Sequence, residues 1–127
     1  MTKQKLLNIL IWIWCFPQQL VGFALQKITK AEKHGDHYRF KSKLGSVSLG
    51  TYIFLCEGHW NSETTLKHEK GHQVQSYILG PLYLLVIGLP SFLWCRYYDT
   101  YGASLKMEYY DFYTEKWADK LGGVERP

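Results

Sequence analysis

The chain has 127 residues and a net charge of +4 at neutral pH; 46% of its residues are hydrophobic and 20% are charged. This length fits one small domain, and this hydrophobic content excludes an intrinsically disordered chain. No repeat or compositional bias supports a coiled coil, a collagen-like chain or a low-complexity protein. The mild basic charge comes without a zinc-finger, helix-turn-helix or RNP pattern, so we expect no nucleic-acid partner. The cysteines are widely spaced and odd in number, which argues against a disulfide framework.

An apolar helix is the first predicted element, and we assign it residues 1–26. Residues 6–25 are mostly apolar but are interrupted by Pro-Gln-Gln at residues 17–19. A membrane-spanning helix needs about 20 predominantly apolar residues, and this segment reaches that length only by including the polar group. We therefore expect it to contact a membrane surface or to dock on the core. The competing interpretation is a secretion signal, with Lys3 and Lys5 at its charged start. We expect the protein at the membrane or in the cytoplasm.

Residues 36–56 predict β structure. Tyr38 and Phe40 alternate with charged residues, and alternation resumes over residues 47–55 after a glycine-containing turn at residues 44–46. Alternation of period two around such a turn is typical of a β-hairpin. We expect a small antiparallel sheet at this point.

Helical patterns occupy most of the remaining chain. Asn61 or Ser62 can cap a helix that runs to about Tyr77, and Gly-Pro at residues 80–81 ends it. Residues 82–93 form a second apolar block, which we expect to be a buried segment wrapped around a small core because glycine and proline interrupt it.

The C-terminal part is predicted to contain one more helix. Residues 96–106 are expected to form a polar, tyrosine-rich connection, and residues 108–121 a final helix that Gly122 and Gly123 stop. The predicted fold class is α+β, with residues 27–127 forming one domain in which a small sheet packs on two helices.

The string His68-Glu69-Lys70-Gly71-His72 is the clearest chemical motif. Residues four apart lie on one face of a helix, so both imidazoles can reach a single metal ion. Glu69 then lies beside the metal and can contact its bound water. The alternative is a histidine pair on a solvated helix surface.

A catalytic zinc ion normally takes a third protein ligand. The spacing that would supply it in metzincins falls on Gln75 and Ile78, which excludes that subclass. Glu115 and Asp119 are four apart on the predicted final helix, so one can bind the metal while the other accepts a hydrogen bond from a ligand histidine. A solvated acidic face is the alternative for this pair. Rival third ligands are Asp99, Glu108 and Asp111.

HExxH followed by ExxxD resembles the gluzincin branch of the zinc metallopeptidases. The strings KHEKGH, GPLYL, LPS and YTEKWAD, within residues 45–123, are similar to short bacterial zincin-like proteins and to metallopeptidase domains of polymorphic toxins. This resemblance implies a minimal zincin-like domain that holds Zn²⁺ through His68, His72 and Glu115. It also implies Glu69 as the general base and Asp119 as a hydrogen-bond partner outside the metal's ligands.

The resemblance further implies hydrolysis of a peptide or protein substrate. Zinc lowers the pKa of its water to about 7, and Glu69 takes a proton as that water attacks an amide carbonyl. The substrate would lie antiparallel to an edge strand, for which residues 47–56 are the candidate. Gly71 would allow a strand to pack closely against the metal-bearing turn. Candidate donors to the oxyanion, among which the sequence does not choose, are His59, Arg96, Tyr109, Tyr110 and Tyr113.

Three functions remain open at this stage. The first is a zinc-dependent metallopeptidase. The second is a metal-binding or membrane-associated interaction protein that keeps a zincin scaffold without turnover. The third is a toxin-like or phage-associated effector with the same chemistry.

Overall fold

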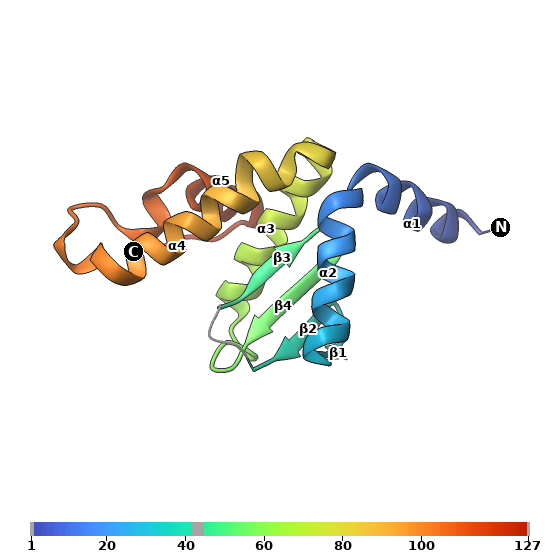
Figure 1. Ribbon diagram of the computed structural model, residues 1–127, viewed down its shortest axis with the longest axis horizontal. Helices are drawn as coiled ribbons and strands as arrows, with labels where there is room; N and C mark the ends of the chain where they lie inside the picture. The colour runs from blue at the N-terminus through green and yellow to red at the C-terminus, as the bar shows by residue number, and fades with distance from the viewer. Residues whose placement is uncertain (1, 42–44, 127) are drawn as a thin grey trace.

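The computed structural model describes residues 2–41 and 45–126 of the chain. Within these residues the fold is α+β, with five α-helices and a small sheet (Figure 1). The helices are α1 (Lys3–Trp14), α2 (Phe16–Thr29), α3 (Glu63–Leu79), α4 (Leu89–Tyr101) and α5 (Tyr113–Gly122). The strands are β1 (Glu32–His34), β2 (His37–Phe40), β3 (Val47–Leu49) and β4 (Tyr52–Cys56).

The sheet is mixed, with strand order β1-β2-β4-β3. Strand β2 runs parallel to β4, with Tyr38 opposite Phe54, and the other two pairings are antiparallel. The predicted hairpin around residues 44–46, of which residue 44 lies outside the described residues, is therefore wrong. Instead the chain reverses within the predicted second strand at Gly50, whose φ of 64° lies in the left-handed region that glycine favours.

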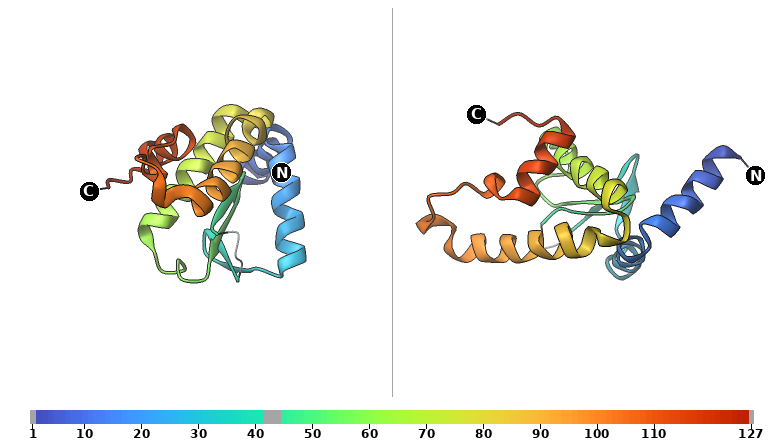
Figure 2. Two further views of the ribbon diagram at one scale, coloured as in Figure 1. Left: turned by 60° about the vertical axis from the view of Figure 1, so that its left-hand side comes forward. Right: turned by 90° about the horizontal axis from the view of Figure 1, so that it is seen from above.

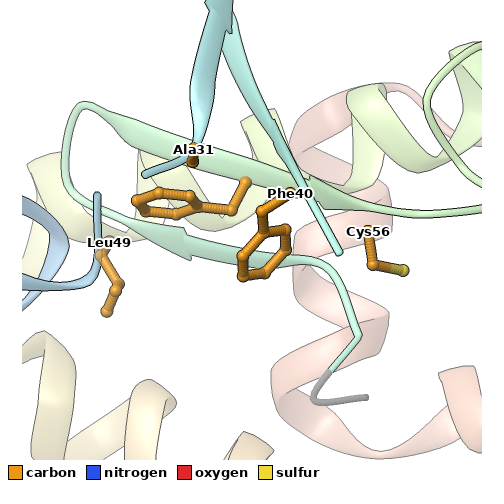
Figure 3. Packing of buried hydrophobic residues seen from close by; sticks show 5 residues of the cluster. Ala31, Phe40, Leu49 and Cys56 are labelled. Carbon is orange, nitrogen blue, oxygen red and sulfur yellow. The ribbon is translucent and has the colours of Figure 1, made fainter. Parts of the chain in front are cut away.

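Helix α2 packs against the sheet at short range. A Cβ atom on Gly22 would lie 2.8 Å from the ring of Tyr52, so only glycine allows this approach. The core beside it is a cluster of buried apolar side chains (Figure 3). Its members are Ala31, Phe40, Leu49, Phe54 and Cys56.

The apolar segment expected as one helix over residues 1–26 forms two helices that meet at 101°. The polar residues explain the bend: Gln18 and Gln19 are fully buried, and their amides donate hydrogen bonds to Gly80 and Thr51. Pro17 lies in the first turn of α2, where its missing N–H costs nothing. No single helix among the described residues is long and apolar enough to cross a membrane; two bent helix pairs, residues 3–29 and 63–104, meet that test only jointly.

The second apolar block is not the buried segment that the sequence suggested. It forms a π-helical segment (Leu84–Gly88) that continues into α4. The side chains of Tyr83, Ile87 and Trp94 are buried, whereas Leu85 is 70% exposed. The predicted polar connection over residues 96–106 is also largely wrong, because α4 extends to Tyr101.

Both helices that carry the predicted metal ligands are present, and the start of the second one differs from the prediction. Ser62 caps α3 by accepting a hydrogen bond from the Thr65 N–H at 3.2 Å, and α3 ends before Gly80. The final helix starts later than predicted, at Tyr113, after a separate 3₁₀ turn (Tyr109–Asp111). Gly123 terminates it in the left-handed conformation.

Candidate metal centre

Two glycines bring α3 and α5 into contact. A Cβ atom on Gly71 would lie 1.8 Å from the carbonyl oxygen of Ala118, and one on Gly122 would lie 2.0 Å from that of Lys67. The close packing predicted for Gly71 therefore exists, but its partner is helix α5 and not a strand. This contact aligns the buried side of α5 with the HExxH turn.

Three buried side chains converge between these helices. The Nε2 atoms of His68 and His72 each lie 2.9 Å from the same carboxylate oxygen, Oε2 of Glu115. Ligand atoms of all three residues lie within 4.8 Å of one another, and each residue is at most 6% exposed. Among the described residues no other group of three could hold a metal ion in this way. The rival ligands, Asp99, Glu108 and Asp111, are exposed.

Hydrogen bonds fix the orientation of both imidazole rings. Nδ1 of His68 lies 2.6 Å from Oδ1 of Asp119, and Nδ1 of His72 lies 2.7 Å from Oε1 of Gln75. The Gln75 amide oxygen is an acceptor, and Oδ1 of Asp119 also accepts a hydrogen bond from Arg126, so we infer that each Nδ1 carries a proton and donates it. The two Nε2 lone pairs then face the Glu115 carboxylate, and three electron-rich atoms meet at one point.

Such a point needs positive charge, from protons or from a cation. Burial lowers the pKa of His72, but its hydrogen bond to Glu115 and the charge of that carboxylate outweigh this and raise the pKa to about 9. Burial raises the pKa of Glu115, yet the hydrogen bonds from both histidines hold it well below its usual range. Two imidazoles and one carboxylate are also the ligand set of a catalytic zinc site, in which the metal would replace these protons.

Glu69 differs from the three converging residues because its carboxylate is not paired. Its side chain is buried, and Oε2 has no hydrogen-bond partner among the described residues. This burial raises the pKa of Glu69. A buried carboxyl group with an open acceptor position can bind a water molecule and exchange a proton with it.

Glu69 and the three converging residues line a cavity of about 330 Å³. Its other walls are strand β3 and apolar side chains of α2, of the π-helical segment and of α4. Strand β3 is an edge of the sheet, whereas β4 is internal, so only the first part of the predicted edge strand has a free side. On that side, the Ser48 carbonyl already accepts a hydrogen bond of 3.0 Å from the Tyr83 hydroxyl.

Of the five candidate oxyanion donors, only Tyr109 lines this cavity. His59 is exposed and contacts the Cys56 sulfur, and the Tyr113 hydroxyl donates to the Val86 carbonyl. Arg96 pairs with the exposed carboxylate of Asp99. The ring of Tyr110 lies edge-on to His68 at 5.2 Å but does not line the cavity.

Three residues beside the site were not anticipated from the sequence, and Gln75, which orients His72, is the first of them. Tyr83 is buried in the cavity wall, and its polar hydroxyl within an apolar string was the only signal that could have marked it. Arg126 donates a hydrogen bond of 2.6 Å to Asp119 and stacks 3.3 Å above the Tyr110 ring. No pattern in the sequence pointed to Arg126.

Comparison of the chain with known protein families, with curated proteins and with solved structures finds no match.

Proposed function

We propose that this protein is a zinc-dependent hydrolase of peptide bonds, with His68, His72 and Glu115 as the metal ligands. The convergence of two imidazole nitrogens on one buried carboxylate oxygen, at 2.9 Å each, carries this proposal. In a tetrahedral zinc site the distance between ligand atoms is about 3.3 Å, so only a small outward movement is needed to admit the ion. When bound, Zn²⁺ supplies Lewis acidity, which lowers the pKa of a coordinated water to about 7.

Each remaining residue of the site has a task in this reaction. Glu69 accepts a proton from the attacking water and passes it to the leaving amine, for which its raised pKa is suited. Asp119 and Gln75 hold the two imidazole rings so that their Nε2 atoms face the metal. Tyr109 is the candidate oxyanion donor, because it lines the cavity.

A zincin-like scaffold is part of the same proposal. An HExxH helix, an edge strand beside it and a later helix that supplies a glutamate all border one cavity. The likeness of the motifs to gluzincins and to short bacterial zincin-like proteins supports this interpretation.

The second candidate function is a metal-binding protein without turnover. One observation favours it: the Tyr83 hydroxyl already donates a hydrogen bond to the Ser48 carbonyl, which a substrate strand would use.

Two measurements on the purified full-length chain test these functions. The first is zinc content by mass spectrometry, and the second is the release of new amino groups from a mixture of denatured proteins. We expect bound zinc in the intact chain and none in H68A/H72A. E69Q should keep its zinc but lose at least about 100-fold in hydrolysis. The matched control is E63Q, which changes an exposed glutamate on the same helix and should alter neither quantity.

The outcomes separate the candidates. A chain that purifies without zinc and binds none on titration, or that keeps zinc in H68A/H72A, contradicts the site. Zinc binding without hydrolysis of any protein in the mixture favours the second function.

A further inference from the structure

Helices α2 and α4 expose a large apolar surface on one side of the molecule. Both helices lie on the same side of the sheet, as the front view and the view from above show (Figures 1 and 2). Ile28 on α2 is 79% exposed, and Leu85, just before α4, is 70% exposed. We call this surface the α2–α4 face, and it consists of Leu20, Val21, Ile28, Leu85, Leu89, Phe92 and Leu93.

The exposed residues on the second helical segment form an ordered stripe. Leu85, Leu89 and Leu93 follow one another at intervals of four, which places them on one side of a helix. Leu84 and Gly88, at the same interval, line the cavity instead. The segment therefore has two apolar sides, and only the inner one has a partner among the described residues.

The α2–α4 face reaches the cavity at two of its residues. Val21 and Phe92 come from the two different helices and both line the cavity, yet they are 46% and 50% exposed. The α2–α4 face therefore borders the cavity from both helices. Soluble monomers rarely expose a continuous apolar patch of more than a few hundred Å² unless it binds something.

Charge indicates what this surface binds. Residues 3–29 and 77–98, which carry α1, α2 and most of α4, contain no aspartate or glutamate. Their charged residues are all basic, and two of them lie beside aromatic rings: Lys27 at 5.5 Å from Phe23 and Arg96 at 5.7 Å from Phe92. Asp99, also on α4, pairs with Arg96 at 3.6 Å, so the excess positive charge of these segments comes from Lys3, Lys5 and Lys27. Exposed apolar and aromatic side chains with such an excess of cations complement the interface of an anionic lipid bilayer.

Helix α1 extends the same chemistry. Its sequence is largely apolar, none of its residues is buried, and it projects away from the rest of the molecule (Figure 1). Lys3 and Lys5 are its only charged residues. Its last turn contacts the rest of the protein, through Trp12 against Phe23 and Tyr52 and through the Trp14 indole N–H, which donates to the Tyr77 carbonyl. The exposed apolar side chains before that turn are typical of helices that lie in a lipid interface.

We propose that the α2–α4 face docks on an anionic lipid bilayer, so that the cavity opens at the lipid surface. The contact expected for residues 6–25 thus includes α4 as well. If the protein is also the proposed hydrolase, its substrate is a peptide with an apolar segment at the membrane surface. This substrate class rests on the proposed function. Lipid docking itself requires neither zinc nor hydrolysis.

Co-sedimentation of the full-length chain with vesicles tests the proposal. Vesicles of phosphatidylcholine with phosphatidylglycerol should bind the chain, and vesicles of phosphatidylcholine alone should bind it more weakly. L89E/L93E should bind the mixed vesicles at least about tenfold more weakly, because two charges enter the apolar contact. The control is M107E, since Met107 is exposed and apolar but lies outside the α2–α4 face. Circular dichroism verifies that each variant is folded.

Three results would overturn the proposal: no binding to mixed vesicles, equal binding by L89E/L93E, or equal weakening by M107E. A chain that is dimeric in solution, becomes monomeric as L89E/L93E and ignores vesicles would assign the face to a second copy. H68A/H72A should bind vesicles like the intact chain, so a failed metal site leaves this test unaffected. If L89E/L93E does not fold, L93S replaces it, with an intermediate loss of binding expected.

Discussion

Replacing Gly71 with alanine tests how the two helices build the site. The added Cβ atom would lie 1.8 Å from the Ala118 carbonyl oxygen and 2.6 Å from its carbon, and both belong to the backbone of α5. Backbone cannot rotate away as a side chain can. Relief to a separation of 3.0 Å therefore requires α3 and α5 to move apart by about 1.2 Å.

The cost follows from two opposing terms. Overpacking of a well-packed contact destabilises a protein by about 1–3 kcal/mol. Alanine in place of glycine stabilises a helix interior by up to about 1 kcal/mol. We expect a net loss of about 1–2 kcal/mol in the free energy of unfolding. Zinc affinity should fall more than stability does, because a metal–ligand distance tolerates a change of only about 0.2 Å and Glu115 moves with α5.

Thermal unfolding and zinc titration of G71A measure both effects. We expect a lower melting temperature and a loss of zinc affinity of at least about tenfold. G88A is the matched control, because Gly88 is also helical: its added Cβ would meet a flexible leucine methyl group at 3.1 Å, and its next contact, with the Tyr83 ring at 3.7 Å, is ordinary van der Waals contact. Unchanged stability and zinc affinity in G71A would refute the reasoning that this helix contact sets the site.

Three further predictions concern the same region. Without metal, protonated His72 stabilises the folded state, because its pKa is raised to about 9. This contribution is complete below about pH 6.5 and is lost as the pH rises through about 9. Melting temperatures in chelator should therefore fall over that window, and those in zinc should not. D119A should bind zinc about 10–100-fold more weakly by calorimetry, because the His68 ring loses its orienting acceptor. Y83F should lose about 1–2 kcal/mol of stability in urea unfolding, because the buried Ser48 carbonyl loses its donor. Equal urea midpoints for Y83F and the intact chain would contradict that role.

Local signals carried the parts of the fold that could be predicted. The cap at Ser62 and the spacing of His68 and His72 depend on residues within one or two helical turns, so the sequence displays them directly. The chain reversal at Gly50 could not be recognised in the sequence for a related reason. A two-residue turn does not interrupt alternation of period two, so the two strands looked like one.

Properties that depend on distant contacts could not be predicted in the same way. Both sides of the segment around α4 are apolar, and composition does not distinguish a side that lines a cavity from one that faces outward. The position of Glu115 in the candidate site depends on a glycine more than forty residues earlier, Gly71. Its spacing to Asp119 indicated a shared face but not the histidines that the face meets.

The shared oxygen of Glu115 makes the three converging residues unequal in the cost of losing them. Without metal, removing the carboxylate leaves two buried imidazoles that can become neutral by releasing a proton. Removing one imidazole leaves a buried anion that has lost half of its pairing, which is the costlier defect. A chain that no longer binds metal would therefore tolerate substitution of Glu115 before substitution of either histidine. The fold would constrain this order of substitution even where catalysis no longer does.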